Sequence, residues 1–223
     1  MADFDEDQKK LVLKIVFYGP ALSGKTTNLM QLHSQLTPER MGELMVLETK
    51  DDRTLFFDML PIGMRSQSGL DLRLKLYTVP GQVQHDSTRK AVLSRADGVI
   101  FVADSQRAQQ HNNAVSFDNL DQNLQKVGID IESLPIALQF NKRDLPDIVE
   151  EATLRERWKS TPWTPPVMAS ALQGYGIIET FQVLLERLFV TIDAEHGLNC
   201  RFGIDKAEFV ARLSNAGGEV HHA

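Results

Sequence analysis

The stretch Gly19-Pro20-Ala21-Leu22-Ser23-Gly24-Lys25-Thr26 decides the fold expected for this chain. It fits the pattern G-x-x-x-x-G-K-[S/T], in which glycines let the backbone wrap closely around a phosphate group. The apolar run 11–17 comes before it, and helical spacing of apolar residues follows over 26–36. The loop therefore joins a buried strand to a helix, and backbone N–H groups at a helix N-terminus bind phosphate.

The side chains at the end of this loop suit a nucleotide with a metal ion. Lys25 would place its ammonium group on the β- and γ-phosphates, and Thr26 would ligate Mg²⁺ through its hydroxyl. The alternative is a chance turn in front of a capped helix. The residues expected to bind the phosphates are Gly19, Pro20, Ala21, Leu22, Ser23, Gly24, Lys25, Thr26 and Thr27.

Short apolar runs alternate with helical patterns along the rest of the chain. The segment 70–79 alternates apolar and polar residues, while 99–103 and 136–140 are continuous apolar runs typical of strands covered on both faces. Helices are expected at 114–127 and 177–190. This order predicts an α/β fold with a mostly parallel sheet. Shorter extended segments are expected at 45–49, 55–60 and 167–170.

The composition is that of a globular domain. The chain has 223 residues, a formal net charge of −6, 42% hydrophobic residues and one cysteine. A single cysteine excludes an internal disulfide framework and favours a reducing, cytoplasmic compartment. The acidic balance argues against bulk binding of nucleic acid or of an anionic membrane. No apolar run approaches the ~20 residues that a membrane span needs.

Asn141-Lys142-Arg143-Asp144 bears on which base the nucleotide carries. It directly follows the run 136–140, at the strand end where open α/β sheets bind ligands. The carboxylate of Asp144 only accepts hydrogen bonds, which suits the N1–H and 2-amino groups of guanine and leaves adenine mismatched. The aliphatic stem of Lys142 can lie along the base. The pattern favours GTP over an ATP-dependent kinase or ATPase, although bland polar turns also produce it.

Ser170-Ala171-Leu172 follows the next apolar segment, Pro166-Val167-Met168. Its backbone N–H groups could reach the O6 atom of guanine. A helix N-cap role for Ser170 is an equally good interpretation.

With these elements in this order, the chain resembles a Ras-like small GTPase, and more narrowly the MglA-type bacterial GTPases of gliding motility and cell polarity. The narrower resemblance rests on Asp52-Arg53-Thr54-Leu55-Phe56-Phe57-Asp58 and on Leu76-Tyr77-Thr78-Val79-Pro80-Gly81-Gln82. It implies a P-loop G domain with a mostly parallel six-stranded sheet and helices on both faces. It also implies GTP and GDP with Mg²⁺ as ligands, hydrolysis of GTP, and a switch for cell polarity and gliding or type IV pilus motility.

The resemblance assigns roles to the switch segments. Gly81 would contact the γ-phosphate through its N–H, and Gln82 would orient the attacking water, with a solvated loop glutamine as the alternative. Thr54 would complete the Mg²⁺ shell. Thr78 stands where most Ras-like proteins have an aspartate that reaches Mg²⁺ through water, so a neutral hydroxyl replaces a carboxylate there.

Arg53 is expected to act as an arginine finger supplied by the chain itself, which a partner only positions. The alternative is a surface ion pair with a neighbouring aspartate. Ala21 occupies a position where close relatives have glycine, and its methyl group would crowd Gln82 and Arg53. This crowding keeps open a second function, a GTP-dependent scaffold with very slow hydrolysis.

The resemblance also implies partners. The segment 55–60 would be presented to a roadblock-fold, MglB-type activating dimer, although an ordinary buried strand explains part of it. Polarity and motility proteins would be the effectors, and they would recruit this protein to the cell poles. Without a partner the protein is expected to be a monomer. The resemblance covers residues 11–190, and the GTPase domain is expected to span residues 1–190. The extension 191–223 has one short amphipathic helix predicted at 205–213, either docked on the domain or free for a partner.

Overall fold

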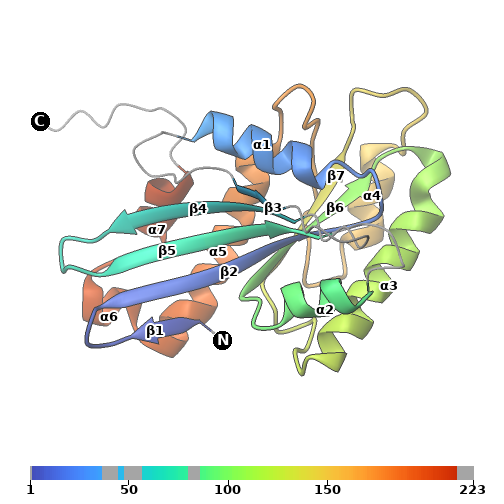
Figure 1. Ribbon diagram of the computed structural model, residues 1–223. Coiled ribbons are helices and arrows are strands. Elements are labelled where there is room, and N and C mark those ends of the chain that lie inside the picture. The colour runs from blue at the N-terminus through green and yellow to red at the C-terminus, as the bar shows by residue number, and fades with distance from the viewer. Residues whose placement is uncertain (1, 37–44, 48–56, 80–85, 215–223) are drawn as a thin grey trace, which may run out of the picture.

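The chain folds into one twisted sheet with helices on both of its faces, as the computed structural model in Figure 1 shows. The structure describes residues 2–36, 45–47, 57–79 and 86–214. The strands in these residues are β1 (Asp3–Asp5), β2 (Lys10–Tyr18), β3 (Met45–Leu47), β4 (Phe57–Arg65), β5 (Asp71–Thr78), β6 (Gly98–Asp104), β7 (Ile136–Asn141) and β8 (Val167–Met168). The helices are α1 (Lys25–Gln35), α2 (Asp86–Leu93), the 3-10 turn η3 (Arg107–Gln109), α3 (Gln110–Lys126), α4 (Glu151–Trp158), α5 (Ile177–His196), α6 (Leu198–Phe202) and α7 (Lys206–Ser214).

The sheet has the order β3-β4-β5-β2-β6-β7-β8, with β1 paired beside β2. Strands β5, β2, β6, β7 and β8 run parallel, whereas β3 and β4 are antiparallel to their neighbours. This confirms the expected α/β fold with a mostly parallel sheet. The sheet has eight strands in the described residues, where the resemblance implies six. Strand β3 lies in the segment 45–49 that was expected to be extended, whereas β1 was not predicted.

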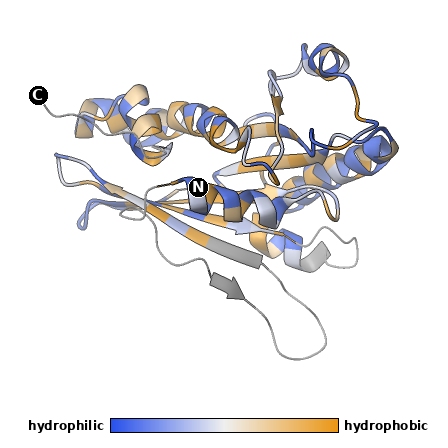
Figure 2. Cartoon of the chain, turned by 90° about the horizontal axis from the view of Figure 1, so that it is seen from above, coloured by the Kyte–Doolittle hydropathy of each residue, from blue (hydrophilic) through white to orange (hydrophobic). Residues whose placement is uncertain are grey.

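Two apolar cores lie on opposite faces of the sheet because successive strand residues point to opposite sides. In β6, Ile100 and Val102 join the core under α1, α5 and α7, while Phe101 and Ala103 join the core under α2, α3 and α4. Every residue of β6 and β7 is buried, which explains their uninterrupted apolar sequences. In Figure 2 these strands form the orange, hydrophobic middle layer.

The C-terminal segment packs on the domain. Helix α5 continues through residue 190 to His196, and α7 occupies the segment for which the sequence predicts a short helix. Phe209 of α7 is fully buried, with its ring centroid 5.4 Å from that of Phe189 on α5. Arg212 also donates a hydrogen bond to the carbonyl of Arg65 on β4, 2.8 Å away. Up to Ser214, the docked arrangement is therefore the one found.

Helix α4 has no counterpart among the sequence predictions, and its packing explains why. Leu154 is its one buried residue, so no apolar stripe at helical spacing marks it.

No helix among the described segments is long and apolar enough to span a membrane.

Candidate nucleotide-binding site

The phosphate loop is the turn between the end of β2 at Tyr18 and the start of α1 at Lys25. Gly19 and Gly24 have φ values of 143° and 97°, which side-chain-bearing residues rarely adopt. A Cβ atom on Gly19 would collide with the carbonyl oxygen of Val102, and one on Gly24 would collide with the amide of Asn141. Both glycines are therefore required for the loop to lie this close to β6 and β7.

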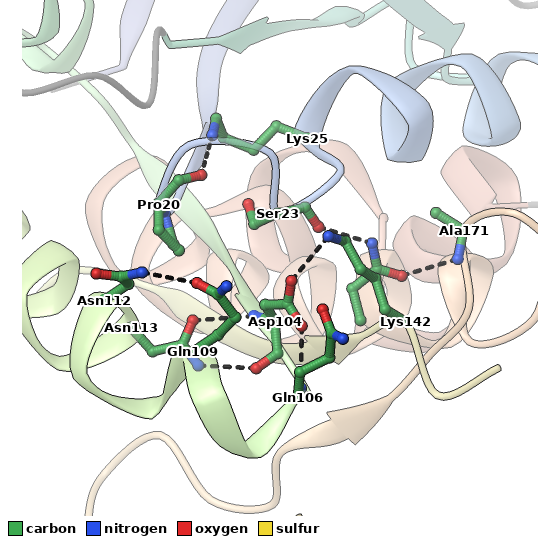
Figure 3. Close-up of polar contacts among 11 residues, drawn as sticks. Pro20, Ser23, Lys25, Asp104, Gln106, Gln109, Asn112, Asn113, Lys142 and Ala171 are labelled. Atoms are coloured by element: carbon green, nitrogen blue, oxygen red, sulfur yellow. Dashed lines mark hydrogen bonds and ion pairs between the residues drawn. The ribbon is translucent and has the colours of Figure 1, made fainter. Parts of the chain in front are cut away.

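Lys25 lies folded back over the loop. Its Nζ donates hydrogen bonds to the carbonyl oxygens of Gly19, at 3.0 Å, and of Pro20, at 2.7 Å, the second of which is drawn in Figure 3. The side chain is buried, and this burial, with a smaller effect from the charge of Arg89, lowers the pKa of Lys25 to about 8. Both partners are neutral carbonyl groups, so a polyphosphate would supply the negative charge that suits this buried ammonium group.

The rest of the loop presents a mixture of backbone and hydroxyl groups. Ala21, Leu22, Thr26 and Thr27 are exposed, and Leu22 has a left-handed φ of 62°. The hydroxyl of Ser23 is fully buried and has no hydrogen-bond partner among the residues that the structure describes. Thr26 and Thr27 lie in the first turn of α1, where their hydroxyls are accessible to a phosphate or to a hard cation, which prefers oxygen ligands.

Asn141 connects the phosphate loop to the loop after β8. Its Nδ2 donates to the carbonyl oxygen of Ser23, and its Oδ1 accepts from the backbone N–H of Ala171, both at 2.8 Å (Figure 3). Asn141 is 2% exposed and ends β7. Three segments that are far apart in the sequence are therefore joined by one side-chain amide.

Asp144 and Ser170 form the next contact at this edge. The hydroxyl of Ser170 donates to the Asp144 carboxylate at 2.5 Å, which fixes one oxygen of the group expected to bind guanine. The N–H groups of Ser170 and Ala171 are used by the carbonyl of Tyr175 and by Asn141. Leu172, which is 76% exposed, carries the remaining backbone N–H of this segment that was expected to reach O6.

Lys142 forms an ion pair with Asp104, a residue to which no role was assigned from the sequence. Its Nζ lies 2.7 Å from Oδ2 of Asp104, the buried residue that ends β6. One sequence signal could have identified Asp104, since it ends an otherwise apolar strand at the edge where the other motifs lie.

The remaining predicted residues divide into two groups. Thr78 is buried and ends β5 in register with Phe17 of β2, so this residue lies at the same edge of the sheet as the phosphate loop. Arg53, Thr54, Gly81 and Gln82 lie outside the described residues.

A glycine-rich loop follows the first long strand of a mostly parallel sheet, and the segments 141–144 and 170–172 follow two later strands. This arrangement defines a class of protein. This class is the P-loop GTPases, and the unit is their G domain. The chain is 41% identical over 184 residues to the mutual gliding-motility protein MglA of Myxococcus xanthus, an alignment that covers 82% of this chain and 94% of that protein. No family model matches the chain. At this identity and coverage the chain belongs to the MglA family, which confirms the resemblance found in its sequence.

The lowered pKa of Lys25 predicts a pH dependence of nucleotide binding. Bound phosphates would raise the pKa of Lys25, so the ammonium group loses its proton at a lower pH in the free protein than in the nucleotide complex. The affinity for nucleotide is therefore highest well below pH 8 and falls as the pH rises through 8. Between pH 7 and 9 we expect the affinity for GDP to fall roughly tenfold, as measured by isothermal titration calorimetry. A Lys25→Arg variant stays charged throughout, so its affinity should not show this fall. An equal pH dependence in both proteins would exclude Lys25 as the cause.

Proposed function

We propose that the protein is a GTP-hydrolysing switch of the MglA type that acts in gliding motility. The observation that carries this proposal is the joining of the phosphate loop to both base-recognition segments through Asn141. The name of the M. xanthus relative supports the role in gliding. The proposed ligands are GTP and GDP with Mg²⁺.

The residues divide the work of binding. Backbone N–H groups of the loop 19–27 and the ammonium group of Lys25 hold the phosphates, and Asp144 reads the guanine edge. Mg²⁺ would be held by the hydroxyls of Thr26 and Thr54, with Thr78 acting through a water molecule, and would neutralise charge on the phosphates. The exposed hydroxyl of Thr26 at the start of α1 fits such an ion.

Hydrolysis needs a positioned water and a stabilised leaving group. Gln82 orients the water whose oxygen attacks the γ-phosphorus, while the bond to the β–γ bridging oxygen breaks and GDP leaves with inorganic phosphate. Arg53 and Lys25 place positive charge on the phosphate oxygens as the transition state forms. Gly81 and Thr54 contact the γ-phosphate and the metal in the GTP state, so their segments are released after hydrolysis.

The partners follow from the family. In this proposal, a roadblock-fold, MglB-type dimer engages the GTP form and positions Arg53. Polarity and motility proteins bind the same form as effectors and bring a cytoplasmic protein to the cell poles.

Single-turnover hydrolysis tests this function. Protein loaded with GTP should release phosphate, and a roadblock-type dimer should accelerate the release. Arg53→Ala should slow the accelerated rate about 10³-fold or more, because an arginine finger contributes ~10³–10⁵. Arg73→Ala is the matched control, since Arg73 is an exposed residue that pairs with Asp71. No phosphate release by the unmodified protein contradicts the GTPase proposal, whereas equal rates for Arg53→Ala and the control contradict only the finger.

The second candidate, a scaffold that binds GTP but scarcely hydrolyses it, is favoured by Ala21. Because the Ala21 methyl would crowd Gln82 and Arg53, Ala21→Gly should hydrolyse GTP faster than the natural protein in the same assay. Equal single-turnover rates would show that Ala21 does not restrain the reaction. A rapid natural rate that the roadblock dimer accelerates further would exclude the scaffold.

A further inference from the structure

The carboxylate of Asp104 is buried at the edge of the sheet where Asn141 lies. It is the last residue of β6, pairs in register with Asn141 at the end of β7, and is 5% exposed. Burying a carboxylate is costly unless it is paired and hydrogen-bonded. The charge of Asp104 at this edge of the sheet must therefore be stabilised by specific partners.

Three contacts fix Asp104, and Figure 3 shows them converging. Its Oδ1 accepts the backbone N–H of Gln106 at 2.9 Å. The side-chain amide of Asn113 on α3 holds its backbone, accepting from the N–H of Asp104 at 2.9 Å and donating to its carbonyl at 2.8 Å. One carboxylate oxygen is thus anchored, and the other, Oδ2, is directed at Nζ of Lys142, 2.7 Å away.

Lys142 needs such a partner because its own side chain is flexible. Lysine has a long stem with many rotamers, and it gives up that freedom only for a specific contact. Its backbone is held in a left-handed conformation, with φ of 67°, and its side chain remains 27% exposed. The ion pair with Asp104 therefore selects the direction of the stem rather than burying the lysine.

We propose that Asp104 is a positioning residue for guanine-nucleotide binding, which holds the stem of Lys142 along the face of the base. The inference rests on the proposed function, because it assumes that the nucleotide occupies the site. In this arrangement Asp144 reads the edge of the base, while the Asp104–Lys142 pair supports its face without reading the edge. Asn113 extends the support to α3.

Groups that contact the edge of the base and groups that contact its face can be distinguished by comparing two nucleotides. IDP lacks the 2-amino group of guanine, so Asp144→Asn should change the ratio of GDP to IDP affinity. A residue that acts on the face of the base should weaken both nucleotides by the same factor. A residue that merely stabilises the fold should alter thermal stability without changing dissociation of the nucleotide from the folded protein.

The experiment measures dissociation of fluorescently labelled GDP and IDP from the full chain by stopped flow. Asp104→Asn keeps an acceptor for Gln106 but removes the charge that attracts Lys142. We expect both nucleotides to dissociate about 10–100-fold faster, the range for loss of one hydrogen bond between charged groups. Asp147→Asn is the matched control, because this carboxylate is 76% exposed, and it should leave both rates unchanged.

A double-mutant cycle shows whether the effect passes through Lys142. Lys142→Met retains an apolar stem without the ammonium group, and in that background Asp104→Asn should change dissociation by less than about twofold. The inference is overturned if Asp104→Asn alone stays within about twofold of the natural rate, or if its full effect persists beside Lys142→Met. Failure of the natural protein to bind GDP would contradict the proposed function, and this inference with it. Normal binding by both the natural protein and Asp104→Asn would contradict this inference alone.

Discussion

The side-chain amide of Asn141 is the contact on which the arrangement of the site depends. It uses its donor on the phosphate loop, at Ser23, and its acceptor on the loop after β8, at Ala171. A shorter side chain could not reach both, and a carboxylate could not donate to a carbonyl. The loop approaches closely enough for this bond only because Gly24 has no Cβ. Asn141 therefore fixes the phosphate loop and the loop after β8, which are proposed to bind the phosphates and the base, relative to each other.

The proposed binding of an anionic nucleotide depends on a few charged groups at the site and not on the net charge of the protein. The net charge of −6 suggests poor affinity for anions, yet the edge of the sheet presents Lys25 among backbone carbonyls and pairs Lys142 with Asp104. Burial holds the pKa of Lys25 at about 8, so a phosphate would stabilise a charge that the protein alone supports weakly. The net charge bears on solubility and partners, while a few buried groups decide which ligand fits.

The sequence predicts those parts of the structure that depend on interactions between residues close together in the chain. The phosphate loop could be recognised because its glycines meet steric needs within eight residues, and β6 and β7 because burial on both faces demands apolar runs. Strand β1 escaped prediction because its sequence, Asp3-Phe4-Asp5, is polar, and its structure comes from pairing with β2. The contacts of Asp104 were not predicted because they involve Lys142 and Asn113, which the fold alone brings near it. Contacts between segments that are far apart in the chain could not be predicted from the local sequence pattern.

The central claim is that this edge of the sheet binds guanine and rejects adenine. Calorimetric titration of the natural protein with GDP and with ADP, in the same buffer containing Mg²⁺, tests it most directly. The account predicts tight binding of GDP and binding of ADP weaker by ~10⁴ or more, because adenine leaves the Asp144 carboxylate without donors. Comparable affinity for the two nucleotides would contradict it.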